Sequence, residues 1–367
     1  MASGCVPGHD PYYLHLCWVP LDVEGCGVEV LTKDADGTHK VDLSPCKRFF
    51  VDTWSRVDLP PVTQLRCART GGVILDLEQG DASNLFKSGY SPPLRFSSVG
   101  RDGETQIHGV IFQPPSAGMF CQSRYRVVEE IYAGPHGANC PKSWQAGRDH
   151  GTARRLAAAG LCVVILDGMG TNFRGCKFLD AAWQALDDQG FPDRKCWIRA
   201  AAAKFPWMDL SEGIGIFGGS AGGQAAMRAL LDHGDLYKVA VADCGCHDNR
   251  IDKIWWNEQW MGPNTQHECY ERASNVVQAN KLKDSQNLLL IVGELDRNVD
   301  PSSTFRVVGA LQRAGKHNFE LCVIVGQGHG AADTEYGRKR RQDFLLKHLQ
   351  PQKTWLEWLA SCRSQLL

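Results

Sequence analysis

A serine between glycines is the first feature of the sequence with an evident chemical use. Ser220 lies in the run 215–223, Gly-Ile-Phe-Gly-Gly-Ser-Ala-Gly-Gly, after the apolar stretch Ile214–Phe217 and before helix-forming residues. The pentapeptide 218–222 fits G-x-S-x-G, in which the serine occupies a strained strand-to-helix turn. Glycines are needed because side chains two residues away would collide with neighbouring backbone. The pattern predicts a nucleophile for acyl groups, although glycine-rich turns also occur for packing alone.

The acid and the base that such a serine requires follow two later strands. Asp296 comes just after the apolar run Leu288–Val292, and His329 comes just after the run Phe319–Val325. In α/β-hydrolases the nucleophile, the acid and the histidine follow in this chain order, each on a loop after a strand. The carboxylate would hold one ring nitrogen of the histidine while the other takes the serine proton. We therefore predict a catalytic triad of Ser220, Asp296 and His329.

Each of the two partners also has a structural interpretation. Asp296 alone would be a turn or helix-cap residue, because Asp300-Pro301-Ser302 opens a helix nearby. His329 alone would be a loop histidine between two glycines. Glu294 and Asp300 are alternative acids, and both fit the strand-end position less well. The combination of residue types, chain order and strand context is what favours catalysis.

The tetrahedral intermediate of acyl transfer needs hydrogen-bond donors for its oxyanion. The backbone N–H of Ala221, the residue after the nucleophile, is the first predicted donor. The second should come from the loop after an earlier strand, where residues 131–137 read Ile-Tyr-Ala-Gly-Pro-His-Gly. The phenolic O–H of Tyr132 could donate there; the alternative is a core aromatic residue. No metal and no organic cofactor is expected, because a triad supplies nucleophile and base by itself.

Composition narrows the function classes. The chain has 367 residues, enough for two domains, and its contents of 43% hydrophobic and 22% charged residues are ordinary for a globular protein. A net charge of −1 gives no basic field that would favour nucleic acid or an anionic membrane. The basic cluster 338–341 is interpreted as a solvated helix face. No apolar run approaches the roughly 20 residues of a membrane span.

Neither the N-terminus nor the cysteines indicate targeting or metal binding. Residues 1–10 lack a basic segment followed by an apolar one, so no signal peptide is predicted, and the compartment is not assigned. The 15 cysteines are scattered without a C-x-x-C pair, which argues against a zinc ribbon or a thioredoxin-type site. Cys244 and Cys246 form the closest pair and are interpreted as small core residues. Most other cysteines are expected to be buried, and the sequence does not decide whether any of them form disulfides.

The pattern of elements changes near residue 90. Before it, short strands separated by turns predict an antiparallel sheet with the strand spacing of a propeller or sandwich. After it, apolar strands alternate with helices, which predicts a mostly parallel, doubly wound α/β sheet. The predicted domains are 1–90, 91–350 and a helical C-terminal tail, 351–367.

The expected elements can be given by their ranges. The early strands are Tyr12–Leu21, Val28–Thr32, Arg48–Val57, Thr63–Arg69 and Val73–Glu78. The later strands are Ile107–Phe112, Val127–Tyr132, Cys162–Leu166, Ile214–Phe217, Val239–Asp243, Leu288–Val292 and Leu321–Val325. The expected helices are Gly147–Ala159, Asp180–Asp188, Ala221–Leu231, Pro301–Ala314 and Thr334–Leu349.

Four motifs in order resemble the prolyl oligopeptidase family of serine peptidases, and most closely its dipeptidyl peptidase IV branch. They are Tyr-Ala-Gly-Pro at 132–135, Gly-x-Ser-x-Gly-Gly at 218–223, Asp-Arg-Asn-Val at 296–299 and Gly-His-Gly at 328–330. The resemblance covers residues 90–350, and the segment 10–90 is similar to the last part of that family's β-propeller. It implies an α/β-hydrolase fold preceded by a partial propeller segment.

The resemblance implies a role for individual residues. Ser220, Asp296 and His329 would be nucleophile, acid and base, and Tyr132 would be the side-chain oxyanion donor. Asn298 matches the position that hydrogen-bonds the carbonyl of the substrate's P2 residue.

The region 246–262 lies where the family builds the pocket for the substrate's P1 residue. Cys246, Trp256 and, after the acid, Val299 are the predicted pocket residues. Asn249 and Asp252 depart from the branch, which usually carries aromatic residues there.

Three functions follow as hypotheses. The leading one is a serine peptidase that hydrolyses short peptides through an acyl-enzyme. A general serine esterase with an open site is the second. The third is a catalytically idle binding protein, because about ninety residues supply at most about two propeller blades. A homodimer is compatible with the resemblance, but no residue demonstrates it.

Overall fold

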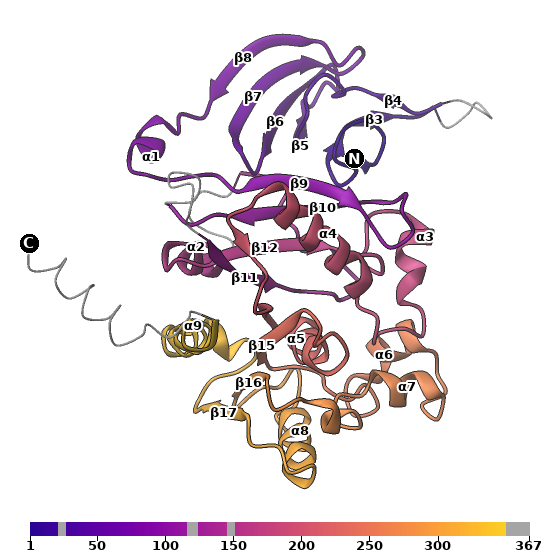
Figure 1. The fold of residues 1–367 in the computed structure, drawn as a ribbon. Coiled ribbons are helices and arrows are strands. Elements are labelled where there is room, and N and C mark those ends of the chain that lie inside the picture. The colour runs from indigo at the N-terminus through magenta and orange to yellow at the C-terminus, as the bar shows by residue number, and fades with distance from the viewer. Residues whose placement is uncertain (21–26, 116–123, 145–150, 350–367) are drawn as a thin grey trace, which may run out of the picture.

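The computed structural model describes residues 1–20, 27–115, 124–144 and 151–349. Within them, a nine-stranded sheet forms the centre of the molecule (Figure 1). From edge to edge its strands are β17 (Phe319–Ile324), β16 (Asn287–Gly293), β15 (Tyr237–Asp243), β14 (Ile214–Gly219), β11 (Tyr125–Glu130), β12 (Cys162–Asp167), β10 (Gln106–Phe112) and β9 (Leu94–Val99), with β13 (Met208–Asp209) beside β11. All neighbours on this path are parallel except β10, which is antiparallel to both β9 and β12. The predicted doubly wound α/β sheet is confirmed.

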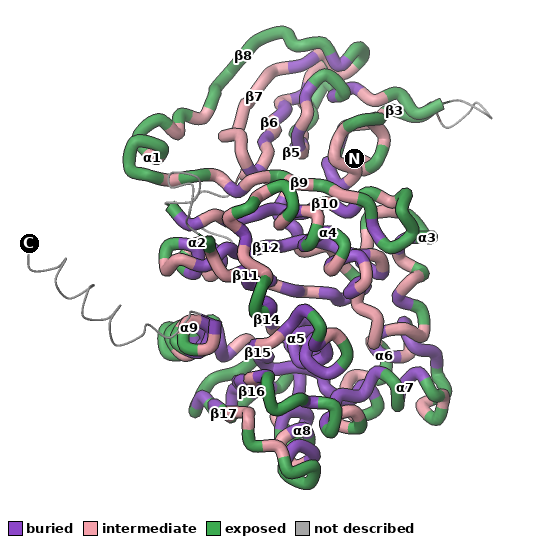
Figure 2. The backbone as a smooth tube through the Cα atoms, in the orientation of Figure 1, coloured by how far each residue is buried: buried purple, intermediate pink, exposed green. Residues whose placement is uncertain are grey.

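Helices cover both faces of this sheet, which explains why its central strands are apolar throughout. The covering helices are α2 (Gly151–Ala158), α4 (Phe191–Lys204), α5 (Ala221–Asp232), α8 (Ser302–Arg313) and α9 (Glu335–Leu349). One apolar cluster joins the sheet to α4, α5 and α8 through Trp197, Met227 and Val307. A second cluster joins the opposite face to α2 and α9 through Leu156 and Leu345. Figure 2 shows that many residues along these strands are buried.

Short helices lie in the segments between the strands. They are α3 (Cys176–Leu179), η1 (Asp180–Ala182), α6 (Ile254–Met261), α7 (Glu268–Ala273), η2 (Ala279–Lys281) and η3 (Ala331–Asp333). Trp260 and Met261 of α6 pack with Tyr270 of α7 and Leu186 in a small third cluster. This cluster fixes the segment that follows β15, from which part of the candidate site is built.

The N-terminal part forms separate antiparallel sheets. Four strands pair in sequence order: β5 (Thr38–Leu43), β6 (Phe49–Arg56), β7 (Leu59–Cys67) and β8 (Val73–Gln79). The smaller pairs are β1 (Ala2–Ser3) with β2 (Leu14–His15) and β3 (Cys17–Trp18) with β4 (Glu29–Val30), and α1 (Ser83–Lys87) follows β8. The ion pair between Lys142 Nζ and Asp10 Oδ2, at 2.8 Å, joins this part to the central sheet.

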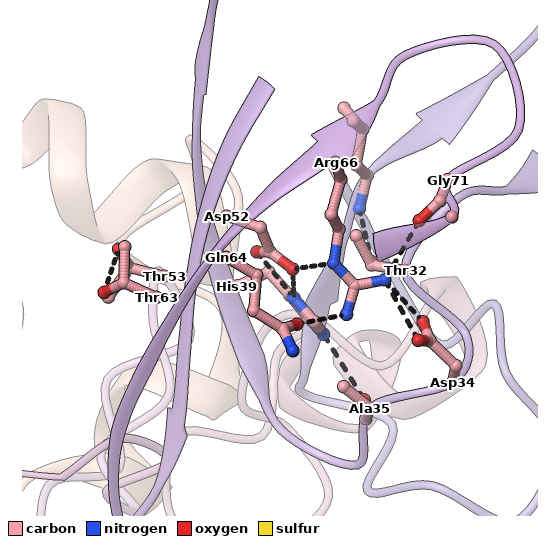
Figure 3. Close-up of polar contacts among 12 residues, drawn as sticks. Thr32, Asp34, Ala35, His39, Asp52, Thr53, Thr63, Gln64, Arg66 and Gly71 are labelled. Atoms are coloured by element: carbon pink, nitrogen blue, oxygen red, sulfur yellow. Dashed lines mark hydrogen bonds and ion pairs between the residues drawn. The ribbon is translucent and has the colours of Figure 1, made fainter. Parts of the chain in front are cut away.

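A buried polar network crosses the four-stranded sheet (Figure 3). The carboxylate of Asp52 lies 2.9 Å from His39 Nδ1 and 3.0 Å from Arg66 Nε. Arg66 also reaches Asp34 at 2.8 Å. The three side chains of Asp52, His39 and Arg66 are almost fully buried, so each charge or ring nitrogen is compensated inside the protein rather than by solvent.

Several expected elements differ from the structure. The strand expected at Tyr12–Leu21 is only the two short pieces β2 and β3, and β5 was not predicted because Thr, His, Lys and Asp interrupt its apolar pattern. The helix expected over Asp180–Asp188 ends after η1, because Gln184 adopts a positive φ of 52°. The long helix α4 was missed, since buried Asp193 and Arg194 break any one-sided apolar stripe.

Other expectations have mixed outcomes. The helical tail at 351–367 and part of Gly147–Ala159 lie outside the described residues. Every cysteine in the described ranges is free. The buried ones are Cys140, Cys162, Cys244, Cys246, Cys269 and Cys322, whereas Cys46, Cys176 and Cys196 are exposed and Cys5, Cys17 and Cys67 are intermediate. The expectation that most are buried is therefore wrong for this part of the chain.

Candidate active site

Ser220 sits at a sharp turn between β14 and α5. Its φ of 58° and ψ of −122° lie outside the regions that side-chain-bearing residues normally adopt. A Cβ at Gly218 would lie 2.4 Å from the carbonyl oxygen of Ile131, and one at Gly222 would lie 2.2 Å from the same oxygen. Both glycines are therefore required by the approach of the neighbouring strand. This geometry is that of a nucleophile elbow.

Asp296 follows β16 and has both carboxylate oxygens engaged. Oδ1 accepts hydrogen bonds from the backbone N–H groups of Asn298, at 2.8 Å, and Val299, at 3.0 Å. Oδ2 lies 2.8 Å from Nδ1 of His329, which follows β17. The side chain of Asp296 is fully buried. Asp296 therefore stabilises the turn and also pairs with the histidine, because it uses a different carboxylate oxygen for each.

The alternative acids are occupied elsewhere. Glu294 Oε2 accepts from the backbone N–H of Gly326 at 2.9 Å, which holds the loop after β17. Asp300 Oδ1 accepts from the backbone N–H of Ser302 at 2.8 Å, at the start of α8. Asp296 is thus the acid that the fold places against the histidine.

The far nitrogen of His329 lies beside a cysteine. Nε2 lies 3.9 Å from Sγ of Cys244, and among the described residues no hydrogen bond joins Nε2 to the Ser220 hydroxyl. Hydrogen bonds of this kind are often long or misaligned in unliganded enzymes and tighten when substrate binds.

Tyr132 and His136 form one wall of the site, on the loop after β11. The Tyr132 hydroxyl lies 3.3 Å from His136 Nε2, and the two rings meet edge to face with centroids 5.6 Å apart. Burial raises the pKa of the Tyr132 phenol, so it remains a proton donor at neutral pH. His136 in turn packs against Trp256 at 6.0 Å. The sequence already placed His136 in the predicted oxyanion loop, but no spacing rule singled it out.

A cavity of about 210 Å³ opens beside the serine. The cavity is lined by site residues that the sequence predicted, namely Tyr132, Ser220, Ala221, Cys246, Trp256, Asn298 and Val299. It is also lined by His136, Asp252, Lys253 and Trp255. Asp296 and His329 lie outside this lining. The structure therefore gathers the oxyanion and substrate-binding candidates around one cavity, with the acid and the histidine behind them.

The cavity wall carries an ion pair. Asp252 Oδ1 and Lys253 Nζ are 3.4 Å apart, and both residues line the cavity. Asn249, in contrast, is buried behind the wall, where it accepts from Gln224 Nε2 at 2.8 Å and donates to Asn257 Oδ1 at 2.6 Å. Asp252 can therefore meet a ligand directly, whereas Asn249 acts by holding the wall.

A second buried carboxyl lies under the elbow. The backbone carbonyl of Asp243 accepts from the Ser220 N–H at 2.9 Å, and its Oδ2 accepts from the Ala332 N–H at 3.2 Å. Burial raises the pKa of Asp243 to about 6. No pattern in the sequence indicated this group, because an aspartate at a strand end has many ordinary uses.

Comparison with known proteins identifies relatives of this site and fold. The model of the prolyl oligopeptidase family of peptidases matches residues 150–352. Human dipeptidyl peptidase 8 is 29% identical over 263 residues, which cover 71% of this chain and 28% of that protein. Probable dipeptidyl-aminopeptidase B of Arthroderma otae is 28% identical over 243 residues, covering 65% of this chain and 25% of that protein. The chain thus spans under a third of the length of these relatives.

Solved structures agree on the fold. A putative dipeptidyl aminopeptidase IV from Bacteroides ovatus superposes with a TM-score of 0.75 at 23% identity, covering 85% of this chain and 43% of that one. Porphyromonas gingivalis dipeptidyl peptidase 4 superposes with a TM-score of 0.72 at 22% identity, covering 88% and 45%. In the described ranges no helix has the length and apolarity to cross a bilayer. The α/β-hydrolase fold and the match to the family model together establish that the chain belongs to the prolyl oligopeptidase family.

Proposed function

We propose that this chain carries the catalytic part of a serine peptidase, in which Ser220 attacks the carbonyl carbon of a peptide bond. His329 takes the serine proton, and Asp296 holds the opposite ring nitrogen and stabilises the imidazolium. The observation that carries the proposal is the 2.8 Å contact between Asp296, after β16, and His329, after β17, at the same edge of the sheet as the strained serine turn after β14.

The reaction follows from these positions. The oxyanion of the tetrahedral intermediate would receive the N–H of Ala221 and the O–H of Tyr132, since both residues line the cavity beside Ser220. Collapse would expel the amine, which takes the proton from His329, and leave an acyl group on Ser220. Water would then release the acid through the same base. For the first step the His329 ring has to turn from Cys244 toward Ser220.

The substrate class is supported by the cavity and by the relatives. The relatives are named as dipeptidyl peptidases or aminopeptidases, and a cavity of about 210 Å³ suits one residue of a peptide. We assign Cys246, Trp256 and Val299 to the P1 pocket and Asn298 to the carbonyl of the P2 residue. Asp252 in that pocket sets this chain apart from an aromatic pocket for proline.

The N-terminal region has a proposed architectural role. The four-stranded meander β5–β8 has the strand number and order of one propeller blade. We infer that residues 1–90 belong to a partial propeller and that residues 91–350 form the catalytic domain. In relatives with more chain, further blades would extend the same region.

Hydrolysis assays test the proposal. Purified chain is assayed with aminoacyl-proline anilides, with a panel varying the P1 residue, and with p-nitrophenyl acetate, alongside Ser220→Ala. The proposal predicts peptide or anilide turnover that falls about 10⁶-fold in the variant. Ester turnover without amide turnover would favour the general esterase. Turnover of neither substrate by folded protein would favour a binding protein.

A further inference from the structure

Cys244 occupies an unusual position directly after β15. It is one of the few non-glycine residues with positive φ, at 42°, and its side chain is buried. Its backbone N–H donates to the carbonyl of Ile291 at 2.9 Å, which ties it to the end of β16. A positive φ is unfavourable for a cysteine. The neighbouring strand ends therefore impose this backbone conformation, and with it the direction of the thiol.

That thiol points at the lone pair of a histidine. Nδ1 of His329 donates its proton to Asp296 at 2.8 Å, so in the neutral ring Nε2 carries the lone pair, 3.9 Å from Cys244 Sγ. Ligand atoms of Cys244, Asp296 and His329 all lie within 4.8 Å of one another. The His329 side chain is 27% exposed, so an ion in solution can reach it.

We propose that Cys244 and His329 form a binding site for a thiophilic divalent cation such as Zn²⁺. Zinc bonds of about 2.3 Å to sulfur and about 2.0–2.1 Å to nitrogen, at a tetrahedral angle, put the two ligand atoms roughly 3.6 Å apart. The observed 3.9 Å needs only a small approach of the two side chains. Asp296 would orient the ring as the carboxylate of a carboxylate–histidine–metal arrangement.

Burial raises the pKa of the Cys244 thiol, so the sulfur carries a proton until a metal displaces it. Without an ion the thiol stays protonated and can share its hydrogen weakly with Nε2. When the metal–sulfur bond forms, the thiol proton leaves to solvent.

Occupation of this site would have a functional consequence, and this consequence rests on the proposed function. A metal on Nε2 removes the lone pair that has to accept the Ser220 proton and holds the ring on the Cys244 side. The ion would therefore act as a reversible inhibitor. The binding site itself does not depend on catalysis.

Binding is measured first without any activity readout. Co²⁺ is titrated into the full chain, and the thiolate-to-cobalt charge-transfer band in the near ultraviolet is followed in the wild type, Cys244→Ala, His329→Ala and the matched control Cys322→Ala, a buried free cysteine that does not line the cavity. The band should saturate at one equivalent in the wild type and the control. It should be lost, or shifted to concentrations more than about 10–100-fold higher, in the other two variants, since a lost ligand costs more than a lost ligand-orienting group.

The consequence is measured by fluorophosphonate labelling with and without Zn²⁺. The labelled fraction should drop in the wild type and in Cys322→Ala and stay constant in Cys244→Ala. A cobalt band that persists equally in Cys244→Ala, or no band at all, would overturn the metal site. A chain that shows the band but is never labelled, with or without Zn²⁺, would keep the metal site and reject the proposed function instead.

Discussion

In the part of the chain that the structure describes, two aspartate–histidine pairs share one geometry but lie in different regions and differ in exposure. In the N-terminal sheet Asp52 lies 2.9 Å from His39 Nδ1, and beside the serine elbow Asp296 lies 2.8 Å from His329 Nδ1. The far nitrogen of His39 meets the carbonyl of Ala35 at 3.3 Å, inside a fully buried network that includes Arg66. The far nitrogen of His329 faces a thiol and a partly open site. An aspartate–histidine pair is thus chemically useful only when its second nitrogen has somewhere to act.

The largest expected effect is on catalysis, and it should separate the two pairs. Asp296→Asn would leave His329 in the wrong tautomer and reduce kcat/KM about 10⁴-fold. Asp52→Asn should leave kcat/KM per folded molecule unchanged, because the far nitrogen of its partner His39 contacts a backbone carbonyl. Steady-state kinetics on both variants, with Asp300→Asn as a strand-end control, makes the test. Equal losses of kcat/KM in Asp296→Asn and Asp52→Asn would contradict the different roles assigned to the two pairs.

The next effect is on stability and separates the buried from the exposed carboxylate that pairs with Arg66 in the N-terminal region. Asp52→Ala leaves a buried guanidinium and imidazole without their anion, which should cost about 3–5 kcal/mol in free energy of unfolding. Asp34→Ala removes the more exposed partner of the same Arg66 and should cost at most about 1 kcal/mol. Urea denaturation of both variants gives the two values. A loss for Asp34→Ala as large as that for Asp52→Ala would show that the buried network is not the source of stability.

A third variant sharpens the description of the serine side. Tyr132→Phe removes the phenolic donor but keeps the ring that packs on His136. We expect kcat to fall about 10²–10³-fold with little change in the melting temperature. If kcat stayed within threefold while KM rose, Tyr132 would be a substrate-packing residue rather than an oxyanion donor.

The smallest effect concerns the carboxyl beneath the elbow. Because the folded-state pKa of Asp243 is raised to about 6 from 3.8, the folded protein retains a proton that the unfolded chain loses between these values. Stability should therefore fall as pH rises from about 4 to about 6, by about 2–3 kcal/mol. Asp243→Asn should flatten that part of the profile. Parallel profiles for wild type and variant, from denaturation at several pH values, would count against a raised pKa.

The sequence was most informative where one residue type has one structural solution. The glycines at 218 and 222 predicted a turn that only glycine can flank, and the measured contacts to Ile131 show why. The apolar runs that became β12, β14, β15 and β16 were predicted nearly to their ends, since a strand covered on both faces has no polar residues to blur its bounds.

The sequence was least informative where the meaning of a residue depends on distant neighbours. The sequence suggested that Cys244 is a small core residue. Only the fold shows that its thiol lies beside His329, which is 85 positions later in the chain. Helix α4 carries a buried Asp193 whose partner, Arg101, lies 92 positions earlier. Such pairs leave no local periodicity, so no window of the sequence reports them.

The most direct test of the central claim is the site of covalent labelling. A fluorophosphonate probe is reacted with the folded chain, and the modified residue is identified by peptide mass spectrometry, with Ser220→Ala as the control. Our account predicts a single adduct on Ser220 that is absent from the variant. An adduct on another residue, or unchanged labelling of the Ser220→Ala chain, would contradict it.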